Sequence, residues 1–289
     1  MNKLKRIFAV LLTLIMVITA LPMSSISSFA VESGAYEYAV IPGEDKTCTI
    51  TGITEYLGKE PNVVIPSIID GYKVVRIDNF AFSWCTWIES AVIPDGVTSL
   101  GRYVFYNCHW LEKITLPDSI TEIGDHTFSE TAYYNTESNW RNGVLYIGNY
   151  IIDTKKDVSE IYNIKQGTKG LADDAFFGCE ELQSIIIPDS VIFIGDYAFE
   201  NCTSLDTIYG VSDSFAETYA EKNNYTFVDF KQGDLNSDAN VGIEDYALMK
   251  DMIFKSGYTA AELASGDLNG DGVIDAFDIA LLNLKISVF

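Results

Sequence analysis

Large apolar residues recur along the middle of the chain at a fixed spacing. Phe82, Phe105 and Phe128 are 23 residues apart, and Phe176 and Phe199 resume the spacing after an interval of 48. Recurrence at one period of this size is typical of a solenoid, in which each coil of chain packs on the next.

One repeat unit contains a strand pattern. In the unit that begins at Phe105, the apolar residues Leu111, Ile114 and Leu116 follow the spacing L-x-x-I-x-L. This spacing is the strand half of a leucine-rich repeat. The pattern predicts an α+β repeat protein, a leucine-rich-repeat solenoid of short parallel strands with a 23-residue period.

A longer motif makes the resemblance specific. Residues 187–205 read I-P-D-x-V-x-x-I-G-x-x-A-F-x-x-C-x-x-L. This motif resembles the bacterial surface leucine-rich repeats of the BspA-like kind. The resemblance covers about residues 36 to 229, with an N-terminal cap at Tyr36 to Gly58 and a closing cap at Ser214 to Phe230.

The repeat is interrupted between Tyr133 and Ile164. Two apolar runs flank Gly148-Asn149, a two-residue sequence that favours a tight hairpin turn. We expect a hairpin near residues 142–153 that bulges from the coil, followed by a degenerate strand at Ile161 to Ile164.

Four of the five cysteines follow the repeat. Each lies three residues after a periodic phenylalanine, and Thr131 takes this place in the interrupted copy; the four are Cys85, Cys108, Cys179 and Cys202. Because threonine needs no covalent partner there, we expect the thiols to be free and buried as small apolar groups. The alternative is a disulfide between neighbouring coils.

Three aromatic residues share a register outside the inward positions. Trp87 and Trp110 are 23 residues apart, and Tyr133 continues the series. Adjacent coils are about 5 Å apart, so this strip could bind sugar rings or a partner protein. The alternative is that the rings only stack on each other and on the hairpin after Tyr134, where they cover an edge of the core.

The sequence after Phe230 contains two related segments. Gly233 to Asp238 and Gly266 to Asp271 align at an offset of 33, and each begins a twelve-residue loop with oxygen-bearing residues at alternate positions. Calcium prefers oxygen ligands at this spacing, with a backbone carbonyl at position seven. The expected ligands are Asp234, Asn236, Asp238, Asn240 and Asp245 in loop one, and Asp267, Asn269, Asp271, Val273, Asp275 and Asp278 in loop two.

The two loops differ from each other and from an ordinary EF-hand. Position twelve is Asp rather than Glu, no clear helix precedes either loop, and helical stretches follow at Tyr246 to Ile253 and Ile279 to Ile286. Loop one has Ala239 where glycine is expected and Gly242 where a ligand is expected. We expect two Ca²⁺ ions, with the second loop binding more tightly.

The duplicated loop and helix resemble a type I dockerin, the module by which secreted bacterial proteins bind the cohesins of a cellulosome. The resemblance implies cohesin contacts at matching positions near the end of each loop and in the helix that follows it. These positions are Ile243, Glu244, Lys250 and Asp251 in the first copy, and Ala276, Phe277, Asn283 and Leu284 in the second.

The first thirty residues read as a secretory signal peptide. A basic start precedes the apolar stretch Ile7 to Leu21 and a small-residue cleavage site at Ser28 to Ala30. An uncleaved anchor is the alternative, although the stretch is short for a membrane span. The predicted domains are therefore 1–30, signal peptide; 31–229, solenoid; and 230–289, dockerin.

Charge narrows the choice of partners. The net charge of −22 repels nucleic acid and anionic membrane surfaces. No nucleophile motif lies near His109 or His126, and the repeats leave no segment long enough for a catalytic domain. We expect a secreted, non-catalytic protein that binds a cohesin and a further protein or glycan. The alternatives are a glycoside hydrolase and a regulatory or protease-inhibiting component of the assembly.

Overall fold

The computed structural model describes residues 31–54 and 59–287. The predicted signal peptide lies outside these residues. Within the described part, no helix has the length and apolar character needed to cross a membrane.

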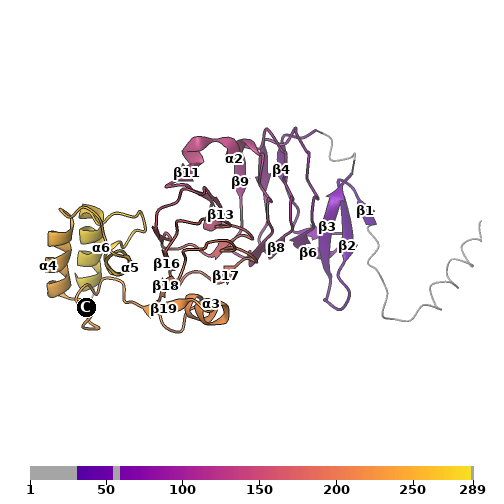
Figure 1. Ribbon diagram of the computed structural model, residues 1–289. Coiled ribbons are helices and arrows are strands. Elements are labelled where there is room, and N and C mark those ends of the chain that lie inside the picture. Colours follow the sequence, from indigo (N-terminus) through magenta and orange to yellow (C-terminus); the bar gives the residue numbers. More distant parts are fainter. Residues whose placement is uncertain (1–30, 55–58, 288–289) are drawn as a thin grey trace, which may run out of the picture.

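The solenoid is a stack of coils whose short strands form sheets on two faces (Figure 1). On the first face the strands are parallel and belong to two separate sheets. The first of these contains β4 (Asn62–Val64), β7 (Ser90–Val92) and β9 (Lys113–Thr115). The second contains β14 (Ile161–Asn163), β16 (Ser184–Ile186), β18 (Thr207–Gly210) and β19 (Thr226–Asp229).

The other face also contains two sheets. The larger contains β1 (Val31–Ser33), β2 (Tyr36–Val40), β3 (Thr47–Ile53), β5 (Ile68–Ile69), β6 (Tyr72–Ile77), β8 (Ser99–Leu100) and β10 (Glu122–Ile123). The smaller contains β11 (Trp140–Arg141), β12 (Val144–Ile147), β13 (Tyr150–Thr154), β15 (Gly170–Leu171) and β17 (Phe193–Ile194). Antiparallel pairing of β1, β2 and β3 closes the N-terminal end of the stack.

The periodic phenylalanines form the centre of the core. Phe82 stacks on Phe105 with ring centroids 5.1 Å apart, and Phe105 stacks on Phe128 at 5.8 Å. Phe176 and Phe199 repeat the arrangement at 5.4 Å. The motif requires glycine after its second isoleucine for a steric reason. A side chain at Gly124 would lie 2.6 Å from the backbone nitrogen of Arg102 in the preceding coil.

The cysteines are free and buried, as expected. The thiol of Cys108 donates to the carbonyl of Phe82 at 3.2 Å, and that of Cys202 donates to the carbonyl of Phe176 at 3.0 Å. These two thiols therefore contact the preceding coil by a hydrogen bond rather than by a covalent link.

Thr131 explains why the repeat is interrupted. Its hydroxyl accepts from the backbone nitrogen of Tyr134 at 3.0 Å and so caps α2 (Ala132–Asn135), which is followed by the 3-10 helix η2 (Glu137–Asn139). A helix therefore starts where the other coils turn toward their next strand.

The hairpin of β12 and β13 does not bulge from the coil, contrary to the expectation. β13 pairs in parallel with β15, so it is a strand of the solenoid face. Leu145 and Tyr150 pack in the N-terminal half of the core, whereas Val144 and Ile151 pack in the C-terminal half. Because the hairpin is apolar on both faces, it is buried between the two halves and joins them.

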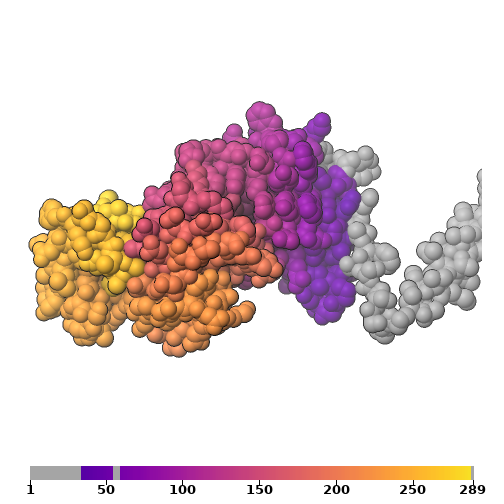
Figure 2. Space-filling model, in the orientation of Figure 1, coloured from indigo at the N-terminus to yellow at the C-terminus, as the bar shows by residue number. Residues whose placement is uncertain are grey.

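The C-terminal end of the stack is closed by α3 (Phe215–Asn223) and β19. A helical module follows with α4 (Ile243–Met252), α5 (Ala260–Gly266) and α6 (Ala276–Ser287). Both α4 and α6 begin three residues before the helical stretches expected from the sequence. Figure 2 shows this yellow module directly against the end of the solenoid.

Candidate functional site: the duplicated loops and the repeat surface

Loop one closes around the side chains of its first and last residues. The carboxylate of Asp234 accepts from the backbone nitrogens of Asp238 at 3.1 Å and Ala239 at 2.9 Å. The carboxylate of Asp245 accepts from Leu235 and Gly242, both at 2.8 Å. These bonds hold both carboxylates inside the loop.

Loop two repeats this geometry. Asp267 accepts from the backbone nitrogens of Gly270 at 2.8 Å and Gly272 at 2.7 Å. Asp278 accepts from Leu268 and Asp275, both at 2.8 Å. The remaining expected ligands lie between these anchors along the loop, and Val273 is the one among them without a side-chain oxygen.

Four of the loop carboxylates are buried without a cationic partner. Asp234, Asp245, Asp267 and Asp278 are at most 6% exposed, and none forms a salt bridge with a lysine or arginine of the described residues. Burial raises the pKa of Asp278 to about 6, and the charge of Asp267 adds to the rise. Buried anions of this kind require a compensating charge, and the oxygen donors fit calcium.

A helix does precede loop two, which corrects the expectation that neither loop has one. α5 ends at Gly266, directly before Asp267. Thr259 caps this helix by accepting from the backbone nitrogen of Glu262, and Glu262 accepts in return from Thr259. This capping box was the sequence signal for the helix.

All eight expected cohesin contacts are exposed. On α6, Phe277 is 71% and Leu284 63% exposed, and Leu281 lies between them at 38%. Their spacing of four and three residues places the three side chains on one side of the helix. We call Phe277, Leu281 and Leu284 the α6 stripe; Leu281 was not predicted.

The expected aromatic strip is not a uniform surface. Trp110 is exposed, whereas Trp87 and Tyr133 pack against the core. The hydroxyl of Tyr133 donates to the carbonyl of Tyr146 in the hairpin at 2.8 Å. Two of its three members therefore have structural contacts.

A different ring ladder was missed by the sequence analysis. Phe80 stacks on Tyr103 at 5.0 Å, and Tyr103 stacks on His126 at 5.0 Å. All three have positive φ, between 55° and 62°. Their 23-residue spacing was the available signal, but a left-handed backbone is uncommon for such residues and is not evident from the sequence.

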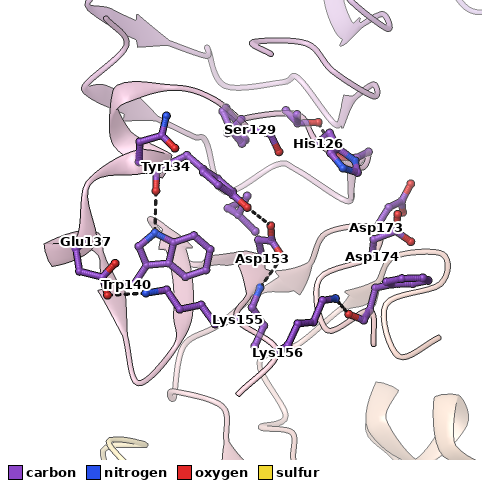
Figure 3. Close-up of a pocket in the computed structure, with 17 residues that line it drawn as sticks. His126, Ser129, Tyr134, Glu137, Trp140, Asp153, Lys155, Lys156, Asp173 and Asp174 are labelled. Carbon is purple, nitrogen blue, oxygen red and sulfur yellow. Dashed lines mark hydrogen bonds and ion pairs between the residues drawn. The ribbon is translucent and has the colours of Figure 1, made fainter. Parts of the chain in front are cut away.

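A pocket of about 760 Å³ lies where the hairpin replaces regular coils (Figure 3). Trp140 and Glu137 lie on one side, and Asp173 and Asp174 on the other. The remaining lining residues are Gly124, His126, Thr127, Phe128, Ser129, Tyr134, Asn135, Ile152, Asp153, Thr154, Lys155, Lys156 and Phe177.

Polar groups in this pocket have unusual surroundings. Tyr134 donates to the carboxylate of Asp153 at 2.6 Å, and burial raises the pKa of Asp153. Burial also raises the pKa of Asp173 to about 6. The hydroxyl of Thr154 is buried and has no hydrogen-bond partner among the described residues. The pocket thus offers aromatic surface and carboxyl groups, whereas the Thr154 hydroxyl is buried beneath it.

Comparison with known families identifies both modules. The model of the BspA type leucine-rich repeat region matches residues 75–206 and 146–247, which together cover more than half of the chain. The model of the dockerin type I domain matches residues 232–287. Among curated proteins, none matches the chain significantly.

Solved leucine-rich repeat proteins are also similar. A protein from T. pallidum is 27% identical, with a TM-score of 0.38 over 63% of this chain and 71% of that one. A protein from Bacteroides ovatus is 26% identical, with a TM-score of 0.35 over 63% of this chain and 47% of that one. This chain therefore spans about half the length of the second protein.

Neither matched family is catalytic, and type I dockerins bind calcium and dock on cohesins in cellulosome-type assemblies. The chain belongs to the BspA-type leucine-rich repeat family and carries a type I dockerin domain at its C-terminal end.

Proposed function

We propose that this protein is a secreted, non-catalytic component of a cellulosome that docks through α6 and uses its solenoid for a second contact. The observation that carries the proposal is the α6 stripe, which begins one residue before the loop-two carboxylate Asp278. An exposed apolar stripe of this kind fits a protein partner.

Two calcium ions complete the module in this proposal. One is held by Asp234, Asn236, Asp238, Asn240 and Asp245, and the other by Asp267, Asn269, Asp271, Val273, Asp275 and Asp278. Calcium supplies the positive charge that the buried carboxylates lack and so stabilises the loops. Loop two binds more tightly, since glycines occupy its two left-handed positions, Gly270 and Gly272.

The cohesin contacts comprise the α6 stripe together with Ala276 and Asn283, and on α4 they comprise Ile243, Glu244, Lys250 and Asp251. Binding of a type I cohesin to the calcium-loaded full chain tests this function. Loss of binding in chelator and in the Phe277→Ala variant is expected. Unchanged binding in both would overturn the docking assignment.

In this proposal, the solenoid binds its second partner at the pocket of Figure 3. Aromatic rings beside carboxyl groups suit either a glycan or a polar protein segment, and the exposed ring of His126 lines the same pocket. The full chain and its His126→Ala variant on glycan and protein arrays test this contact. A ligand whose binding is the same in both would place the contact elsewhere, with the strip of Trp87, Trp110 and Tyr133 the next candidate.

The enzyme alternative has a direct test. Incubation of the calcium-loaded chain with cellulose, xylan and pectin is expected to release no sugar. Turnover would overturn the non-catalytic proposal and would favour the glycoside hydrolase alternative. Inhibition of a protease by the chain would instead favour the regulatory one.

A further inference from the structure

The dockerin module and the solenoid share an apolar interface. α5 packs against β14, β16 and β18, the strands of the first solenoid face. Ile186 of β16 lies in the same buried cluster as Leu263 and Ala264 of α5. The module is therefore seated on the sheet and is not only tethered to it.

The corresponding positions in the N-terminal half show that this burial is specific. Val64, Val92 and Thr115 occupy one register across β4, β7 and β9. Asn163, Ile186 and Tyr209 occupy the same place in β14, β16 and β18. Val92 is 36% exposed, whereas Ile186 is 1% exposed because α5 covers it.

The calcium loop itself is part of the interface. The Asn163 side-chain amide donates to the Asp267 carboxylate at 2.9 Å and to the Asp267 carbonyl at 3.3 Å. The Asn142 side-chain amide donates to the carbonyl of Asp271 at 3.1 Å. Two solenoid residues thus bind residues that the proposed function assigns to calcium.

Gly270 allows the loop to approach this closely. A side chain there would lie 2.5 Å from Cα of Lys165 in the solenoid. Gly272 has a similar positive φ, yet its nearest neighbour in the solenoid is the Asn142 amide at 3.9 Å. The two glycines therefore have the same conformational role, but only Gly270 is required by the contact.

We propose that the solenoid completes calcium loop two, because Asn163 positions the ligand Asp267. Calcium binding in turn fixes the dockerin on the solenoid. Coupling between two sites is reciprocal, so a contact that favours calcium binding is itself strengthened by calcium. The α6 stripe stays exposed in this arrangement, and a cohesin meets it in one fixed orientation relative to the repeats.

The inference rests on the proposed calcium binding. Calorimetric titration of the full chain distinguishes a failure of the proposed function from a failure of this inference alone. Asn163→Ala is expected to weaken the loop-two site about 10-fold and to leave the loop-one site unchanged, because ligand-orienting residues contribute at this scale. Absence of calcium binding in the wild-type chain would overturn the proposed function and this inference together. Two normal sites in the Asn163→Ala variant would overturn only the inference.

Small-angle scattering at saturating calcium tests the fixed arrangement. Ile186→Asp is expected to increase the maximum dimension of the particle, whereas Val92→Asp, its matched control in the exposed half, is not. Gly270→Ala is expected to behave like Ile186→Asp, and Gly272→Ala like the wild type. Circular dichroism confirms that each variant is folded. An unchanged dimension in Ile186→Asp and Gly270→Ala would overturn the proposal.

Discussion

Ala239 of loop one and Gly272 of loop two occupy the same loop position and the same left-handed backbone, with φ values of 68° and 87°. Ser237 and Gly270 form a second such pair, at 60° and 72°. A left-handed conformation costs a residue with a side chain about 1 kcal/mol, and glycine avoids this cost. Loop one therefore carries strain at two positions where loop two has none.

Ala239→Gly is expected to increase the calcium affinity of loop one about 5-fold, which corresponds to about 1 kcal/mol of relieved strain. Calorimetry in an Asp267→Ala background isolates this loop. Gly272→Ala in an Asp234→Ala background is the converse control and is expected to weaken loop two by a similar factor. If Ala239→Gly left the affinity unchanged, the unequal loops would need another cause.

Phe277→Ala and Leu284→Ala are each expected to weaken cohesin binding by about 30-fold, because exposed apolar anchors of this kind contribute about 2 kcal/mol. Surface plasmon resonance with immobilised cohesin measures the loss. Phe80→Ala is the matched control, since Phe80 is an exposed phenylalanine of the ring ladder on the solenoid. Equal losses in all three variants would indicate a general effect on folding rather than a contact.

Asp173→Asn is expected to stabilise the protein at pH 7 by about 1 kcal/mol. Burial raises the pKa of Asp173 from 3.8 to about 6, so between these values the folded state keeps a proton that the unfolded state has lost. Stability therefore decreases as pH rises through this window, and the asparagine removes the dependence. The side-chain oxygen of Asp173 accepts from the backbone nitrogen of Asp196. At the equivalent position of an earlier coil, the side-chain oxygen of Asn79 accepts from the backbone nitrogen of Arg102 at 2.7 Å. The repeat therefore accommodates asparagine at this position.

Thermal unfolding in chelator between pH 4 and pH 7 measures this effect. Asp95→Asn is the control, because Asp95 is an exposed turn residue of the solenoid. A pH profile that is the same in Asp173→Asn and wild type would show that the buried carboxyl does not govern stability in this range.

The five thiols are expected to resist alkylation in the folded protein at pH 8, because all five are buried away from the reagent. Burial raises the pKa of Cys85 to about 11 and that of Cys108 to about 12, so little reactive thiolate forms at either. Mass spectrometry after iodoacetamide treatment should show no adduct in the native state and five adducts in denaturant. Three adducts in denaturant would reveal a disulfide.

The repeat could be predicted from the sequence because each coil places its core residues by local spacing. The phenylalanine stack and the thiols in neighbouring coils follow from the 23-residue period alone. The loop anchors Asp267 and Asp278 likewise follow from local spacing, since the backbone donors that hold them come from the loop itself. The hairpin was placed correctly along the chain, but its burial was not predicted, because apolar residues on both faces do not identify which surfaces will cover them.

The solenoid and the duplicated loops could be predicted from the chain alone, since both depend on short-range spacing, and the exposed residues Phe277 and Leu284 of α6 followed from the resemblance to a dockerin. How the two modules meet depends instead on contacts between residues that are far apart in the chain. Val92 and Ile186 have the same repeat register and similar chemistry, yet one is exposed and the other buried. The bond from Asn163 to Asp267 joins residues 104 positions apart. Such contacts form when one folded module packs on another, and no local pattern in the chain specifies them.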